Sequence, residues 1–152
     1  MSTTFLTTSP RQTQKLGEKT AKDILKARNR RRAMVLGLTG GLGGGKTTFL
    51  QGFAKGLGIK EKVLSPTFII MRRINLACRQ ARNFYHIDCY RLKEPQELLD
   101  LDFKKIIADS KNIVAVEWAD QVKEVMPRGT EWISFEFIDD KTRKIIASTL
   151  KK

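Results

Sequence analysis

The 152-residue chain lacks the sequence features of disulfide-rich, zinc-binding, membrane-spanning and secreted proteins. The two cysteines, Cys78 and Cys89, are too few for a disulfide framework, and their spacing matches neither a CxxC redox pair nor a zinc ribbon. No apolar run approaches the ~20 residues that span a bilayer. The first ten residues also lack a basic stretch followed by an apolar core. The composition therefore predicts a cytoplasmic protein with reduced thiols and no membrane segment.

Histidine and acidic residues are also scarce. The single histidine, His86, lies in an apparent strand, which favours a structural or hydrogen-bonding role over metal ligation. Acidic residues are outnumbered, so the formal charge is +13, and residues 11–32 hold nine Lys/Arg against two Asp/Glu. Such a field attracts polyanions, including nucleic acid. A solvated helix face that keeps the protein soluble explains the segment equally well.

Hydrophobic patterns predict one α/β domain over residues 11–152. Residues 1–10 are rich in Ser and Thr and end in Pro10, which predicts a flexible tail. Helical spacing begins at Thr13 and recurs over residues 47–57, where Gly58 supplies a stop. The apolar runs 33–39 and 113–116 are typical of strands buried on both faces. The remaining expected elements are strands at 68–74 and 84–87, short helices after Pro95 and up to Val125, and a hairpin over 132–149.

The glycine-rich segment between the first buried run and the following helix matches the pattern G-x-x-x-x-G-K-[ST]. Its residues are Gly40, Gly41, Leu42, Gly43, Gly44, Gly45, Lys46 and Thr47. Glycines let consecutive amides converge on phosphate oxygens at a helix N-terminus. Lys46 can then bridge the β- and γ-phosphates, Thr47 can bind Mg²⁺ and Thr48 can contact the α-phosphate. A plain strand-to-helix turn needs one or two glycines, so the pattern predicts a cradle for ATP or a close relative.

Two carboxylates follow apolar strands and are candidates for binding magnesium or orienting water beside the phosphates. Glu117 ends the run 113–116, where it can hold Mg²⁺ or orient water, although a surface carboxylate paired with a lysine would look the same. Asp88 follows another strand in the same way, with Arg91 as a candidate arginine finger. Thr67, in a stiff Ser-Pro-Thr turn, can reach the γ-phosphate like a switch threonine.

These segments together resemble the TsaE (YjeE) family of small ATPases in tRNA threonylcarbamoyladenosine (t6A) biosynthesis. The matching stretches, in chain order, are T-x-x-L-G at 13–17, the glycine loop at 40–48, S-P-T-[YF] at 65–68, H-x-D-x-Y-R-L at 86–92 and V-E-W at 116–118. The last two motifs are specific for the family, because few other P-loop proteins combine them at this separation from the glycine loop. The order of helices and strands fits a three-layer α/β sandwich with an antiparallel portion in the middle and at the end. Together with the resemblance, it predicts a three-layer P-loop NTPase sandwich with a mixed sheet.

The resemblance also implies roles and partners. Lys46 and Thr47 would act on phosphate and Mg²⁺, Glu117 would be the Walker-B-like carboxylate, and Asp88 an essential acidic residue. Thr67 would belong to a switch-like loop. Family members work with the transferase TsaD and its scaffold TsaB, and use ATP hydrolysis to reset that complex.

The chain departs from the family pattern at three places. Gly41 stands where most members have Asp, and Gly44 where most have Ala, which predicts a looser loop. The stretch 101–103 reads Leu-Asp-Phe where the family often has Met-Gly-Ile. The strong positive charge is also atypical, which leaves partner and tRNA contacts open.

Three functions therefore compete. The first is a TsaE-type ATPase, slow alone and faster with its partners, with Lys46, Asp88 and Glu117 as catalytic residues. The second is a small P-loop kinase, which would need a lid with several arginines. The third is a nucleotide-gated tRNA-binding or scaffold protein with negligible hydrolysis, which the basic segment 26–32 motivates.

Overall fold

The computed structural model describes residues 2–27, 30–41, 43–62 and 70–148 of the chain. These residues form seven strands and five helices, one of them a 3-10 helix, η1. The strands are β1 (Ser2–Thr7), β2 (Met34–Thr39), β3 (Met71–Asn75), β4 (Asn83–Asp88), β5 (Asn112–Glu117), β6 (Glu131–Phe137) and β7 (Arg143–Ser148). The helices are α1 (Pro10–Lys26), α2 (Lys46–Gly56), α3 (Gln96–Leu99), α4 (Phe103–Ala108) and η1 (Ala119–Val125).

The strands form one mixed sheet in the order β1-β7-β6-β2-β5-β4-β3. The four strands β6, β2, β5 and β4 pair in parallel. The strands β1, β7 and β3 are antiparallel to their neighbours. Parallel pairing brings the carboxyl ends of β2, β5 and β4 to the same edge, which is where ligands collect in such sheets.

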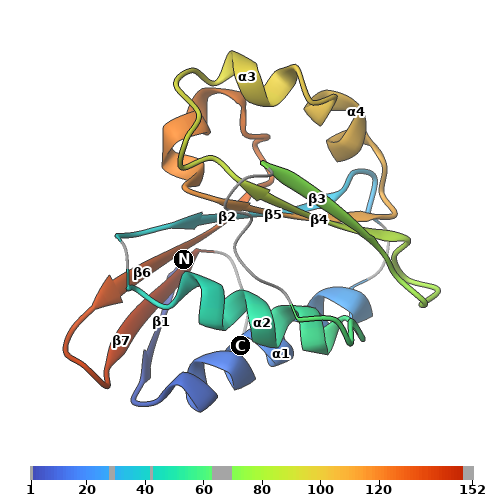
Figure 1. Cartoon of the computed structure of the whole chain (residues 1–152). Coiled ribbons are helices and arrows are strands. Elements are labelled where there is room, and N and C mark those ends of the chain that lie inside the picture. Colours follow the sequence, from blue (N-terminus) through green and yellow to red (C-terminus); the bar gives the residue numbers. More distant parts are fainter. Residues whose placement is uncertain (1, 28–29, 42, 63–69, 149–152) are drawn as a thin grey trace.

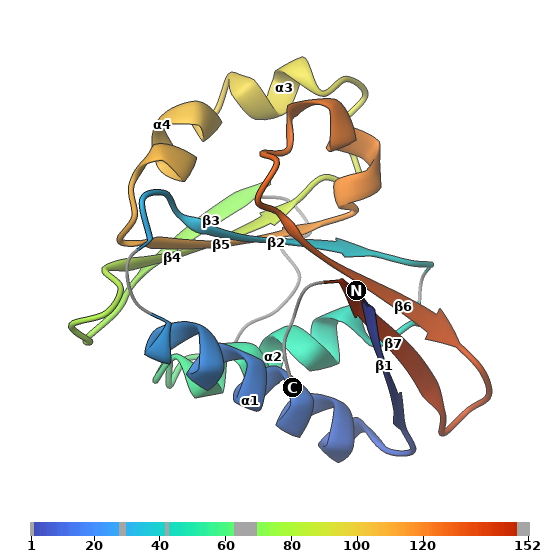
Figure 2. The same ribbon diagram turned by 180° about the vertical axis from the view of Figure 1, so that it is seen from behind.

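Helices cover both faces of the sheet, so the protein has three layers (Figures 1 and 2). On one face lie α1 and α2, and on the other lie α3, α4 and η1. Two clusters of buried apolar side chains fill the spaces between the layers. Every residue of β5 is buried, as its apolar run predicts. The predicted three-layer α/β sandwich with a mixed sheet is confirmed.

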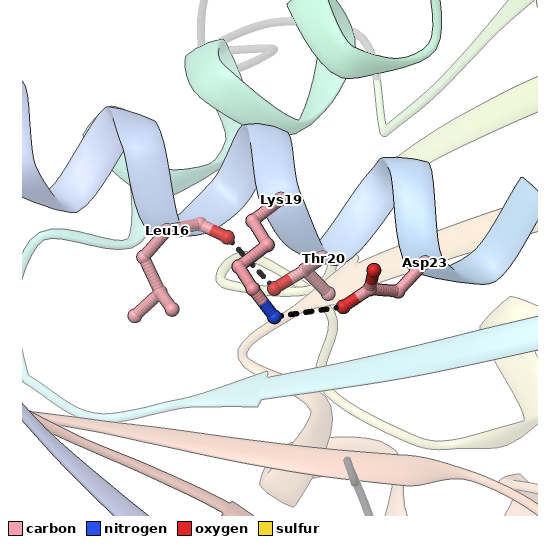
Figure 3. Close-up of polar contacts among 4 residues, drawn as sticks. All are labelled: Leu16, Lys19, Thr20 and Asp23. Carbon is pink, nitrogen blue, oxygen red and sulfur yellow. Dashed lines mark hydrogen bonds and ion pairs between the residues drawn. The ribbon is translucent and has the colours of Figure 1, made fainter. Parts of the chain in front are cut away.

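Helix α1 begins earlier than its apolar spacing predicts. The Ser9 hydroxyl accepts a hydrogen bond from the Gln12 amide, and Pro10 occupies the first turn, where its missing amide costs nothing. Farther along the helix, Lys19 and Asp23 form an exposed ion pair of 3.1 Å, while Thr20 donates to the Leu16 carbonyl (Figure 3). The cap and the proline therefore fix the start of the helix better than the apolar pattern does.

The flexible tail predicted for residues 1–10 is wrong for residues 2–7. These residues form β1, an edge strand that pairs antiparallel with β7 over its whole length. Phe5 packs against the core, and the buried Thr7 hydroxyl lies 2.7 Å from that of Thr13 on α1. Threonine is β-branched and favours strands, so the Ser/Thr-rich composition that suggested disorder is compatible with an edge strand.

The other predicted elements agree with the structure at most positions. Gly58 adopts the left-handed conformation expected of a helix stop, with φ 84°. Residues 68 and 69 of the predicted strand lie outside the described residues, and β3 is described from Met71.

The structure adds a helix, α4, that was not predicted. The residue before it, Asp102, adopts the left-handed conformation with φ 62°. The family pattern noted in the sequence often has glycine here, and aspartate tolerates this conformation better than most other residues.

Both thiols are free, as the cysteine spacing predicts. Burial raises the pKa of the Cys89 thiol to about 12, with a smaller contribution from the neighbouring Asp88 carboxylate. Cys78 is half-buried, and its thiol contacts the Ala81 carbonyl at 3.2 Å.

Within the described ranges, no helix is both long and apolar enough to cross a membrane.

The close packing of α1 on α2 depends on glycine. A Cβ added at Gly52 would lie 1.8 Å from the Gln14 carbonyl oxygen, and one at Gly17 would lie 2.1 Å from that of Phe49. We predict that Gly52→Ala lowers the free energy of unfolding by about 1–3 kcal/mol, because overpacking outweighs the better helix propensity of alanine. Urea denaturation measures this, with Gly129→Ala as the control because its Cβ would meet no atom of the described chain within 4 Å. A Gly52→Ala variant as stable as wild type would contradict the packing argument.

Candidate functional site

The glycine loop joins the end of β2 to the start of α2. Gly40, Gly43 and Gly45 have backbone φ values of 126°, 78° and 101°, which residues other than glycine rarely adopt. A Cβ at Gly40 would also lie 2.2 Å from the Phe135 carbonyl oxygen. The loop therefore needs glycine for both its backbone conformation and its close approach to β6.

The two glycines that depart from the family pattern differ in their surroundings. A Cβ at Gly41 would meet no atom of the described residues within 4 Å, which is compatible with the aspartate that the family pattern predicts at this position. A Cβ at Gly44 would lie 3.1 Å from the Cβ and the carbonyl oxygen of Phe135. Glycine at position 44 thus suits the tight contact with β6 in this chain.

Lys46, the first residue of α2, is buried with 6% of its surface exposed. Its ammonium donates a hydrogen bond back to the Gly40 carbonyl and lies 3.7 Å from the centroid of the Trp118 ring. Burial lowers the pKa of Lys46, and nearby carboxylates, that of Glu117 foremost, oppose the shift. The ammonium forms no ion pair with any described residue. It is a buried cation held by a backbone carbonyl and a ring.

The two predicted carboxylates lie at neighbouring positions of parallel strands. Asp88 ends β4 and Glu117 ends β5, and the two are register partners. Asp88 is half-buried, and its Oδ1 accepts a 2.9 Å hydrogen bond from the Tyr90 amide. Burial raises the pKa of Asp88, while that hydrogen bond acts in the opposite direction. The strand ends place both acidic groups at the edge that carries the loop.

His86 holds the Glu117 side chain in place. The two side chains are buried, with 1% and 3% of their surfaces exposed, and His86 Nε2 lies 2.7 Å from Glu117 Oε2. The tautomer that carries its hydrogen on Nε2 donates to the carboxylate. Nδ1 is buried and has no hydrogen-bond partner among the described residues. The hydrogen-bonding role predicted for His86 is confirmed, and its partner is the candidate magnesium ligand.

These groups share one pocket of about 380 Å³. Of the predicted site residues, the pocket is lined by Gly43, Gly44, Gly45, Lys46, Thr47, Thr48, Asp88 and Glu117. Gly40 and Gly41 do not line it, although Gly40 receives the Lys46 hydrogen bond. Leu42 and Thr67 lie outside the described residues. The structure therefore brings the loop and both carboxylates together.

Other pocket residues were not predicted. Arg143, from β7, donates from Nε to the Gly43 carbonyl at 2.8 Å, and its guanidinium lies 4.5 Å from the Phe137 ring centroid. Trp118 and Tyr90 form a second wall, with ring centroids 4.9 Å apart. Arg91, the candidate arginine finger, does not line the pocket. Arg143 lies 100 residues from Gly43, and no spacing rule in the sequence connects them.

The residues fit a magnesium ion that arrives with phosphate. Thr47 and Glu117 line the same pocket and offer oxygen ligands, which Mg²⁺ prefers. No group of three or more His, Cys, Asp or Glu side chains in the described ranges is arranged to hold a metal on its own. Mg²⁺ commonly takes one or two protein ligands and completes its shell with phosphate oxygens and water. The donor set therefore suits an ion shared with a nucleotide.

Comparison with known proteins agrees with the motif pattern. A family model described as "Threonylcarbamoyl adenosine biosynthesis protein TsaE" matches residues 7–145. The chain belongs to the TsaE family. The family takes part in t6A biosynthesis, so the resemblance seen in the sequence is confirmed.

Individual relatives support the same assignment. The TsaE protein of Haemophilus influenzae is 31% identical over 136 residues, which cover 89% of this chain and 83% of that relative. The Bacillus subtilis TsaE protein is 40% identical over 111 residues, which cover 73% of this chain and 66% of that relative, just under two thirds of its length. The crystal structure of Bacillus subtilis YdiB superposes with a TM-score of 0.75 at 29% identity, covering 97% of this chain and 84% of that one.

The buried His86–Glu117 pair generates a stability prediction for this TsaE protein. We expect Glu117→Ala to lower the free energy of unfolding by about 1–3 kcal/mol, because His86 loses the partner of its buried Nε2. Glu117→Gln should lower it less, since the amide oxygen still accepts the hydrogen bond. Urea denaturation of both variants decides the matter. Equal losses from Gln and Ala would show that the hydrogen bond contributes nothing.

Proposed function

We propose that this protein binds ATP with residues 40–48 and hydrolyses it with Mg²⁺ in support of the t6A modification of tRNA. The observation that carries the proposal is the state of Lys46. The Lys46 ammonium is buried and forms no ion pair with a carboxylate of the described residues, so no direct contact neutralises its charge. Lys46 lines the same pocket as residues 43–45 of the glycine loop. The β- and γ-phosphates of a nucleotide would supply the missing negative charge.

The remaining residues have complementary roles in the proposed reaction. Loop amides from Gly43 to Thr48 would surround the phosphates at the N-terminus of α2. Thr47 and Glu117 would hold Mg²⁺, whose chemistry is to neutralise charge that develops on the phosphate oxygens. Asp88, with its raised pKa and its place beside Glu117, would orient the attacking water and accept its proton.

His86 supports this arrangement indirectly. Its hydrogen bond to Glu117 Oε2 fixes the orientation of that carboxylate before any ligand arrives. Partners that orient a ligating side chain commonly affect metal affinity by 10–100-fold. We therefore assign His86 a positioning role rather than a catalytic one.

The proposed partners are a TsaD-like transferase and a TsaB-like scaffold protein in the cytoplasm. Family membership supports the proposed partners, because the TsaE family takes part in t6A biosynthesis. In this scheme ATP hydrolysis resets the partner complex between cycles, so turnover should be slow alone. The kinase alternative requires several arginines over the phosphates. Among the described residues that line the pocket, Arg143 is the single arginine.

Phosphate-release assays test the ATPase proposal. We expect Lys46→Ala to abolish release, and Glu117→Gln and Asp88→Asn each to lower kcat by about 100-fold or more, since general bases and charge-stabilising groups contribute on this scale. Lys55→Ala, which removes an exposed lysine from the same helix, should leave the rate unchanged.

The same assay with TsaB and TsaD present tests the coupling. Faster release with the partners is the expected outcome, and equal rates in both mixtures would contradict the coupling. Wild-type activity in the Lys46→Ala variant would refute the nucleotide site itself.

A further inference from the structure

A second hollow lies at the opposite edge of the sheet from the nucleotide pocket. It measures about 570 Å³ and is lined by four cationic side chains together with small and uncharged residues. The cationic residues are Lys26, Arg30, Arg79 and Lys111, and the others are Leu25, Ala27, Gln80 and Ser110. Among these lining residues there is no carboxylate and no aromatic ring.

The four cations come from separate parts of the fold. Lys26 ends α1, and Arg30 lies between α1 and β2. Arg79 belongs to the turn between β3 and β4, and Lys111 directly precedes β5. The amino ends of β4 and β5 lie at the same end of the sheet because the two strands are parallel (Figures 1 and 2). The carboxyl ends of the same strands carry Asp88 and Glu117.

Hydrogen bonds hold these segments together. The Lys111 carbonyl accepts from the Arg82 amide at 2.6 Å, and the Lys111 ammonium donates to the Arg79 carbonyl at 3.3 Å. The Arg30 guanidinium donates to the Ile24 carbonyl near the end of α1. The hollow is therefore built by contacts between elements rather than by unconnected surface chains.

The positive charge in the hollow is not neutralised locally. None of the four cations forms an ion pair with a described residue. The nearest acidic residue in sequence, Asp109, accepts from the Lys111 amide at 2.9 Å and does not line the hollow. Burial lowers the pKa of the Arg30 guanidinium, with no carboxylate acting to offset it. Bringing like charges together costs Coulomb energy, which a bound polyanion would recover.

We infer that this hollow binds the phosphate backbone of RNA, and specifically of tRNA. The absence of aromatic rings among its described lining residues fits phosphate contacts rather than base stacking. The preference for RNA over another polyanion rests on the proposed role in t6A modification. ATP would bind at one edge of the sheet and tRNA at the other, which leaves both sites open at the same time.

Filter binding of an unmodified tRNA transcript at several NaCl concentrations tests the inference. We expect the double variant Arg79→Glu/Lys111→Glu to bind about tenfold or more weakly, and to show a shallower dependence on salt, because two phosphate contacts are lost. The neutral variant Arg79→Gln should lower the salt slope by about one. It also covers the case in which the double variant does not fold.

The control is Lys93→Glu/Lys123→Glu, which makes the same change in net charge with two exposed lysines that follow the carboxyl ends of β4 and β5. This control should bind tRNA within about twofold of wild type if charge acts locally. Calorimetric ATP binding should be unchanged in all variants, which separates this inference from the proposed function. Equal weakening by both double variants would overturn the inference, as would tighter wild-type binding to phosphatidylserine vesicles than to tRNA.

Discussion

The site depends on how the chain accommodates one buried cation, Lys46. Its ammonium is held by the Gly40 carbonyl and the Trp118 ring, without an ion pair in the described structure. The two contacts differ in conformational cost. Gly40 adopts φ 126°, which glycine reaches without strain, whereas Trp118 adopts the left-handed region at φ 57°, which is rare for a bulky residue. The strain at Trp118 persists because the surrounding structure fixes it, and the two contacts together hold a positive charge at the N-terminus of α2.

The parallel core of the sheet explains why distant residues meet around that charge. Strand ends that are neighbours in the sheet place Asp88 beside Glu117 and close to the loop that follows β2. For this reason both carboxylates were predictable as the residues that follow buried runs. The loop was predictable from its own G-x-x-x-x-G-K-[ST] pattern, and the three-layer fold from the order of helices and strands. The His86–Glu117 hydrogen bond was not, because it depends on strand register between residues 31 positions apart. Arg143 was missed for the same reason, since it reaches the loop through the terminal hairpin.

Composition was the weaker guide. The Ser/Thr-rich N-terminus suggested disorder, yet β1 gains its hydrogen bonds from β7, a partner far along the chain. The excess of basic residues at 11–32 predicted attraction for polyanions, and this segment contributes Lys26 and Arg30 to the hollow. Arg79 and Lys111 come from other loops, and no pattern in the sequence connects them to that segment. Local sequence patterns thus predict which secondary structure a segment can form. Contacts between distant segments determine which charged side chains lie close together. The two edges of the sheet consequently carry different chemistry. One has acidic groups beside Lys46, and the other has cations that form no ion pair within the described part of the chain.

The most direct test of the account is tryptophan fluorescence in a Trp132→Phe variant, in which Trp118 is the remaining indole. Binding of Mg-ATP should draw the Lys46 ammonium from the ring 3.7 Å away toward phosphate, and so change the Trp118 emission. Adding Lys46→Met should remove that change. Unchanged emission at an ATP concentration that calorimetry shows to be saturating, or the same change without Lys46, would contradict the claim that this lysine is the phosphate-binding group.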